Sequence, residues 1–198
     1  MTEVIIPFPA PIERLEKMRA VRSTLVSSSL HAIRQRGLSP RYFERLPAKW
    51  HEDVRALVAG TWMPMDLVRA HYEVLDALVP DNDERMAIGR EVADRIQGSL
   101  LATLARLSTG AGVTPWSGLA AMPRLWERIF QGGAVSLIKH GPKDAQLDMA
   151  HFPLMEVGYF NTAFRGVAAA GLELFCRKLY VAAMPRTGVV WHCKFSWA

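Results

Sequence analysis

Apolar and polar residues alternate with two different periods along this chain, and the period changes near residue 133. Before that point, apolar residues recur at three- and four-residue steps, which is the period of an amphipathic helix. After it, segments 134–141 and 144–154 alternate apolar and polar residues, as half-buried strands do. The pattern therefore predicts a helical first two thirds followed by a small sheet.

Segment 81–110 carries the strongest helical pattern, with Met86, Ile96, Leu100 and Leu104 on one side. Acidic residues at its start interact favourably with the positive, N-terminal end of a helix dipole. We predict one helix of about 26 residues, long for a globular domain, as the spine of the fold. Gly89 and Gly98 in this segment allow another helix to approach closely.

Other helices are predicted earlier in the chain, over 13–37, 39–46 and 65–79. Serines compete for backbone hydrogen bonds, so we expect a break or a short strand in the first of these near Leu25 to Ser28. Before it, Pro7, Pro9 and Pro11 disfavour helix and strand pairing. Residues 1–12 are therefore predicted to form an extended arm, followed by a single domain over 13–198.

After the first two strands, helical spacing returns over 156–178, and two further strands are expected over 178–185 and 188–197. The expected fold class is α+β. N-terminal helices and one long central helix would pack on a four-stranded antiparallel sheet, with a strand-strand-helix-strand-strand order in the last third.

Composition fits one ordered domain, because 50% of the 198 residues are hydrophobic and 22% are charged. The net charge of +5 is spread along the chain, with no basic run, so nucleic acid is not an expected partner. Two cysteines make no disulfide framework. No secretory signal or membrane-length apolar run is present, so we expect a cytoplasmic protein without a transmembrane segment.

Several stretches resemble one known family. These are "SSSLHAIRQRGLSPRYFERLP", "RALVAGTWMPMDLVRAHY", "IGREVADRIQGSLLATLARLSTGAGVTPW" and "RLWERIFQGGAV". They are similar to a myxobacterial family of paralogous proteins of comparable length, a domain of unknown function. The resemblance runs from about residue 20 to Trp197 and implies a bacterial protein without assigning an activity.

The order of elements also resembles a wider fold group. It includes the vinyl-reductase domain of ligand-sensing regulators, the haem nitric-oxide-binding domain and small subunits of a vesicle-tethering complex. The resemblance implies N-terminal helices and one long helix on a twisted antiparallel sheet. It also implies a small molecule bound between helices and sheet, or dimerisation through helices.

The pair His192-Cys193 lies in the last predicted strand, where adjacent side chains point to opposite faces. We therefore expect a buried, inert Cys193 and an outward His192. The segment "CKFSW" is similar to the Cys-x-Phe close of the vinyl-reductase domain, whose cysteines hold zinc. Residues 180–192 contain none of the accompanying cysteines, so zinc is not expected.

Haem is not expected from the sequence either. No cysteine pair is followed by histidine, and the Tyr-Ser-Arg cluster of the haem nitric-oxide-binding domain is missing. His71 lies on an apolar helix and is predicted to be a hydrogen-bonded core residue. We predict no cofactor.

Aromatic residues before and after residue 133 could line a pocket between the long central helix and the sheet, with arginines as its polar anchor. The candidate ligand-binding residues are Trp116, Arg124, Trp126, Phe130, Phe152, Tyr159, Phe164 and Arg165. The alternative is that they only pack the core. No Ser-His-acid arrangement or carboxylate pair is recognisable, so no catalytic residue is predicted.

These observations leave three interpretations. The first is a non-catalytic regulatory or signalling domain that binds a small apolar ligand between the long helix and the sheet. The second is a protein-interaction or assembly module, a homodimer or adaptor without ligand. The third is a haem or metal-binding sensor. In each case a homodimer is expected.

Overall fold

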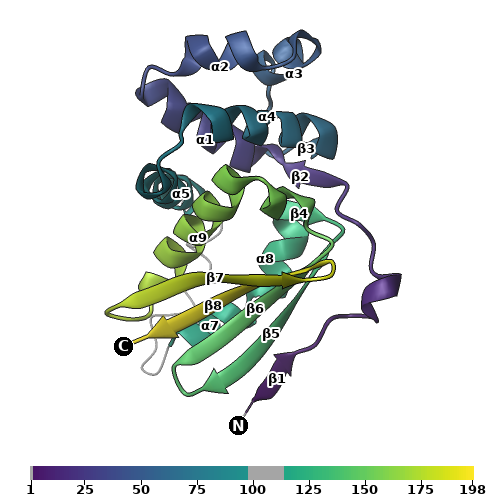
Figure 1. The fold of residues 1–198 in the computed structure, drawn as a ribbon, viewed down its shortest axis with the longest axis vertical. Helices are drawn as coiled ribbons and strands as arrows, with labels where there is room; N and C mark the ends of the chain where they lie inside the picture. The colour runs from purple at the N-terminus through teal and green to yellow at the C-terminus, as the bar shows by residue number, and fades with distance from the viewer. Residues whose placement is uncertain (1, 98–113) are drawn as a thin grey trace.

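A computed structural model describes residues 2–97 and 114–198 (Figure 1). The N-terminal helices gather at one end of the molecule and the main sheet at the other, with α5 and α9 between them. The helices are α1 (Ser23–Gln35), α2 (Ser39–Arg45), α3 (His51–Arg55), α4 (Met65–Leu78), α5 (Asn82–Gln97), α7 (Pro115–Ala120), α8 (Met122–Ile129) and α9 (Gly158–Glu173). Short 3-10 turns cover Ile12–Arg14, Ala48–Trp50 and Pro153–Glu156.

The main sheet is antiparallel and has the order β1-β5-β6-β8-β7. Its strands are β1 (Glu3–Ile6), β5 (Ala134–Gly141), β6 (Asp144–Ala150), β7 (Leu179–Thr187) and β8 (Val190–Trp197). The expected α+β fold and its strand-strand-helix-strand-strand order are confirmed. The sheet has one strand more than expected, because β1 pairs with β5 at one edge.

A second, small sheet was not predicted. It joins β2 (Ala20–Arg22), β3 (Trp62–Pro64) and β4 (Phe130–Gln131) in the order β3-β2-β4. Strands of two or three residues are too short to show a period of two. The pairing therefore becomes visible only once the helices bring these segments together.

The expected break between Leu25 and Ser28 is wrong, because α1 is continuous from Ser23 to Gln35. Its serine hydroxyls bond back to carbonyls of the preceding turn, Ser27 to Thr24 at 3.1 Å and Ser29 to Val26 at 2.9 Å. These bonds satisfy the hydroxyls without opening the helix, which removes the reason for a break.

The predicted spine is described as α5 over Asn82–Gln97, and the remainder of that prediction, including Gly98, lies outside the described residues. α5 crosses α9 at two glycines. A β-carbon on Gly89 would collide with the carbonyl of Ala163, and one on Gly166 with the carbonyl of Met86. The close approach expected at Gly89 is confirmed.

Over residues 2–97 and 114–198, no helix combines the length and the apolar character that a bilayer crossing needs.

Candidate functional site: an apolar cavity around α9

A cavity of about 140 Å³ lies where α5, α7, α8 and α9 meet. Two residues of α1 and one each of α4, β4 and β8 complete its wall. Among the described residues, the lining comprises Leu25, Ser29, Tyr72, Gly89, Val92, Ala93, Ile96, Gly118, Leu119, Met122, Leu125, Trp126, Ile129, Phe130, Tyr159, Phe160, Ala163, Phe164, Val167, Ala168, Gly171, Leu172, Phe175 and Phe195. The lining is almost wholly apolar, as expected of a site for a hydrophobic ligand.

The helical period of α9 supplies much of this wall. Tyr159, Phe160, Ala163, Phe164 and Val167 recur at steps of one, three and four, so they share one face of the helix. The glycines at the α5–α9 crossing leave no free space, because the facing backbone fills it, whereas an added β-carbon on Gly171 would meet nothing within 4 Å. The cavity therefore combines large side chains of α9 with a small residue, Gly171, in the same wall.

An aromatic cluster stiffens the side of the cavity near α8. The Trp126 ring lies 4.6 Å from Phe130 and 4.6 Å from Phe152, measured between ring centroids. Phe160 and Phe164 stack at 6.0 Å along α9. Such edge and stacked contacts add to the stability of the wall beyond the area that they bury.

Tyr159 is the exception to this apolar wall. Its side chain is 1% exposed, and its hydroxyl has no hydrogen-bond partner among the described residues. Burial raises the pKa of this phenol above its ordinary value, so it stays protonated and can donate a hydrogen bond. A buried hydroxyl without a partner is unfavourable by about 1–3 kcal/mol, which a ligand with an acceptor atom would relieve.

His71 is a buried residue whose two ring nitrogens both form hydrogen bonds. The Ser29 hydroxyl donates to the Val26 carbonyl, so His71 Nε2 must donate to Ser29 Oγ, at 2.7 Å. His71 Nδ1 then accepts from the Tyr42 hydroxyl at 2.8 Å. Burial lowers the pKa of His71 to about 3, so the ring is neutral. The prediction of a hydrogen-bonded core histidine is confirmed.

The structure separates the predicted site residues into two groups. Trp126, Phe130, Tyr159 and Phe164 line the cavity, and Phe152 packs behind it. The helical period of α9 also brings Phe160 and Val167 to the wall.

The remaining three predicted residues lie away from the cavity. Trp116 packs on Trp197 at 5.1 Å and donates to the Pro142 carbonyl at 2.8 Å. Arg124 is exposed, and Arg165 bonds within α9, to Thr162 at 3.2 Å. The polar group in the described wall that lacks a partner is thus the Tyr159 hydroxyl, not an arginine.

His192 and Cys193 point to opposite faces of β8, as predicted. His192 Nδ1 lies 2.6 Å from Asp148 Oδ1 on one face, while Cys193 is buried on the other. Burial raises the pKa of the Cys193 thiol to about 12, so the thiol is inert at neutral pH. Within the described ranges, no three His, Cys, Asp or Glu side chains come together as a metal site would require.

Three side chains of the described cavity wall are of kinds that can ligate haem iron, Tyr72 and Tyr159 through their oxygens and Met122 through its sulfur. No histidine or cysteine belongs to that wall. The donor set therefore includes oxygen and thioether ligands of haem iron, but a porphyrin is larger than about 140 Å³ and would have to move the surrounding helices apart.

No protein family model matches this chain, and no curated protein matches it either. Solved structures do. An H-NOX protein mutant from K. algicida is similar with a TM-score of 0.68 at 9% identity, over 89% of this chain and 96% of that one. An oxygen-binding H-NOX domain related to soluble guanylate cyclases gives 0.60 at 13% identity, over 89% and 94%. The chain therefore has the H-NOX fold.

These neighbours correct one prediction. Another of them, with a TM-score of 0.59 at 12% identity over 89% of this chain and 99% of its own, concerns heme redox potential and porphyrin distortion. The expectation of no cofactor, with haem set aside, is therefore wrong, because this fold is one in which haem is bound. The sequence does not contain the Tyr-Ser-Arg cluster, and a fold can persist without one of its motifs.

Proposed function

We propose that this chain is a sensor domain whose signal is the occupancy of the α5–α8–α9 cavity by a hydrophobic ligand. The observation that carries the proposal is the Tyr159 hydroxyl, which is buried without a partner in an otherwise apolar wall. A cavity of this kind selects a ligand with an apolar body and one hydrogen-bond acceptor.

The size of the cavity bears on how a ligand would act. At about 140 Å³ it compares with an engineered cavity that admits benzene. A larger ligand has to move the surrounding helices apart. Such a ligand favours the conformation with separated helices, and this difference in affinity is what a sensor requires.

Tyr159 connects the cavity to the helical end of the molecule. Its backbone N–H donates to Asp76 Oδ1 on α4, and the same oxygen lies 2.9 Å from Arg85 Nη2 on α5. Arg85 also donates to the Val79 carbonyl at 2.6 Å. A ligand that displaces Tyr159 therefore acts directly on a junction of three helices.

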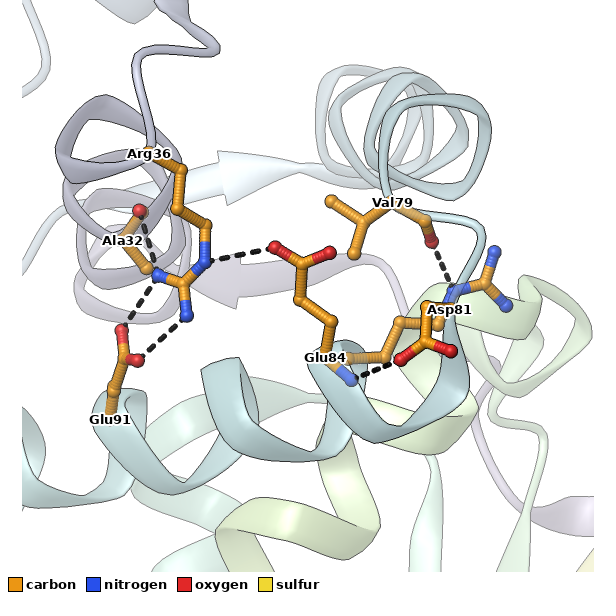
Figure 2. Close-up of polar contacts among 7 residues, drawn as sticks. Ala32, Arg36, Val79, Asp81, Glu84 and Glu91 are labelled. Atoms are coloured by element: carbon orange, nitrogen blue, oxygen red, sulfur yellow. Dashed lines mark hydrogen bonds and ion pairs between the residues drawn. The ribbon is translucent and has the colours of Figure 1, made fainter.

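The displacement can be passed on to α1 through Arg36 (Figure 2). Arg36 makes a two-pronged contact with Glu91 of α5, at 2.7 and 2.9 Å, and reaches Glu84 at 3.2 Å. It also donates to the Ala32 carbonyl of its own helix at 3.0 Å. Because a forked contact fixes orientation as well as distance, α1 is coupled to any movement of α5.

Haem is the candidate ligand that the fold comparisons favour. Tyr159 or Met122 would hold its iron, and Phe160, Phe164 and Trp126 would enclose the porphyrin. When bound, haem would supply an iron that takes up a diatomic gas. The chain's own part is to exclude water and to direct the Tyr159 hydroxyl toward the bound group.

The test is a pair of titrations of the full chain, one with haem followed by the Soret band and one with the fluorescent probe anilinonaphthalene sulfonate. A saturable Soret shift that Tyr159→Phe or Met122→Leu alters identifies haem. Saturable probe binding without a haem spectrum identifies a smaller apolar ligand. Binding of neither would contradict the proposal.

A further inference from the structure

Strand β7 forms one edge of the main sheet, and within the described chain it pairs only with β8 (Figure 1). It is nine residues long, from Leu179 to Thr187. In an antiparallel strand, alternate residues direct their N–H and C=O groups away from the paired neighbour. An edge of this length therefore offers a row of backbone groups to another strand.

The usual protection of an edge strand is weak here. Leu179–Met184 contains no charged residue, and the proline in the strand, Pro185, comes near its end. Tyr180 is 55% exposed and Met184 36% exposed. Lysine or an early proline at these positions would discourage pairing, and neither is present.

A groove of about 480 Å³ runs beside this edge. β7 supplies Leu179 to Ala182 to it, and Lys194 and Ser196 of β8 extend it across β7. On the other side α5 supplies Met86 and Arg90, and α9 supplies Ala169. A groove between an edge strand and a helix is the arrangement in which an extended peptide adds to a sheet, with backbone bonds on one side and side-chain contacts on the other.

Charge indicates what would occupy the groove. From residue 174 to the end, the chain has Arg177, Lys178, Arg186 and Lys194 but no aspartate or glutamate. Arg186 and Lys194 contact Glu156 and Asp144, at 3.0 and 4.0 Å. Lys178 lies 5.0 Å from the Tyr180 ring, with no carboxylate partner in the described chain.

A second copy of this chain is a poor occupant in the register centred on Ala182, because antiparallel self-pairing of β7 would there place Lys178 of one copy opposite Arg186 of the other. We propose that the β7 edge takes an acidic, extended segment of a partner protein as an added strand. This inference does not depend on the cavity, and it assigns the chain a separate output surface.

The test uses the full chain and a labelled peptide of alternating valine and glutamate, followed by fluorescence anisotropy and hydrogen exchange. The peptide should bind, protect β7 amides, and lose affinity as salt is added. A valine-lysine peptide should not bind. A valine-glutamate peptide N-methylated at alternate residues along its pairing edge should not bind either, because it lacks the N–H groups that pair.

Matched variants locate the surface. Lys178→Glu with Lys194→Glu should weaken binding about fivefold to tenfold, whereas Lys49→Glu in the distant helical layer should not. Ala182 and Ala183 are neighbours in β7, so one of them directs its N–H toward β8 and the other directs it away from the sheet. Proline at the position whose N–H points away from β8 should keep the fold and abolish peptide binding. Equal binding of the N-methylated or basic peptide, no binding at millimolar peptide, or self-association through β7 would each overturn the proposal.

Discussion

Asp76 on α4 accepts the backbone N–H of Tyr159 and so caps the first turn of α9 from another helix. Val157, the residue that precedes α9, has no side-chain oxygen and makes no capping bond of its own. The cap is therefore supplied through the tertiary fold, and it fixes the turn that carries Tyr159, whose buried hydroxyl has no partner among the described residues.

Asp76→Asn should lower the free energy of unfolding by about 1–3 kcal/mol, because it removes a charged acceptor that serves both Tyr159 and Arg85. Urea denaturation measures the change. Asp66→Asn, an exposed residue at the start of the same helix, is the control and should change stability by less than about 1 kcal/mol. Equal losses in both variants would show that Asp76 is not a specific cap.

Gly89→Ala and Gly166→Ala should each destabilise the protein by about 1–3 kcal/mol, since the added methyl meets backbone carbonyl atoms of the facing helix. Gly171→Ala is the control on α9, because its β-carbon would meet nothing within 4 Å. That variant should be neutral or more stable by up to about 1 kcal/mol. Thermal unfolding distinguishes the two outcomes, and a stable Gly166→Ala protein would contradict the close crossing.

His71 should make stability depend on pH. Its pKa is about 3 in the folded chain against an ordinary 6.5, so below pH 6.5 the unfolded chain binds a proton that the folded chain does not. Stability is therefore complete above 6.5 and falls on acidification toward 3, by about 1.4 kcal/mol per pH unit.

His71→Gln should be less stable at neutral pH, with a flatter pH dependence from 6.5 to 4 in denaturation curves. The exposed His140→Gln serves as the control and should keep the wild-type slope. An unchanged slope in His71→Gln would contradict the neutral, buried assignment.

Arg36→Lys should loosen α1 from α5, because a lysine cannot make the forked contact with Glu91. Hydrogen exchange in α1 should become faster, while Arg34→Lys on the exposed face of the same helix should leave it unchanged. The Arg36 hydrogen bond holds the pKa of Glu91 below its ordinary value, so the variant should also raise that pKa. Unchanged exchange would remove Arg36 from the proposed coupling.

The long helices and strands of this fold could be predicted because their apolar residues repeat with a clear period. Segment 156–178, for example, has a helical period over its whole length, so α9 and the strands on either side of it were recognisable in the sequence. The short strands Ala20–Arg22 and Phe130–Gln131 could not, because their pairing depends on tertiary contacts that bring distant segments together.

The site was predicted in part for the same reason. Trp126, Tyr159 and Phe164 lie at regular helical positions, so the face on which they lie could be inferred. Trp116 packs on Trp197, and the pattern of a short helix does not indicate which apolar neighbour an aromatic residue contacts. Pattern also cannot show whether a buried tyrosine finds a partner, and this is the property that distinguishes Tyr159.

Tyr159→Phe tests whether the Tyr159 hydroxyl binds a ligand or whether the side chain only packs the core. In the free protein it removes a hydroxyl without a partner, so unfolding should be unchanged or harder by about 1 kcal/mol. In the presence of a ligand with an acceptor atom, the same variant should bind about tenfold more weakly. A variant that is clearly destabilised and yet binds normally would contradict the proposed role.

The central claim is that a hydrophobic ligand occupies the cavity, and Gly171→Phe tests it most directly. Gly171 lines the cavity, with nothing within 4 Å of its added β-carbon, so the new ring should fill the space while the fold is kept. Calorimetric titration with haem or anilinonaphthalene sulfonate should show binding to the wild type and to Leu174→Phe, an exposed control on the next turn, but not to Gly171→Phe. Undiminished binding to a folded Gly171→Phe protein would contradict the account.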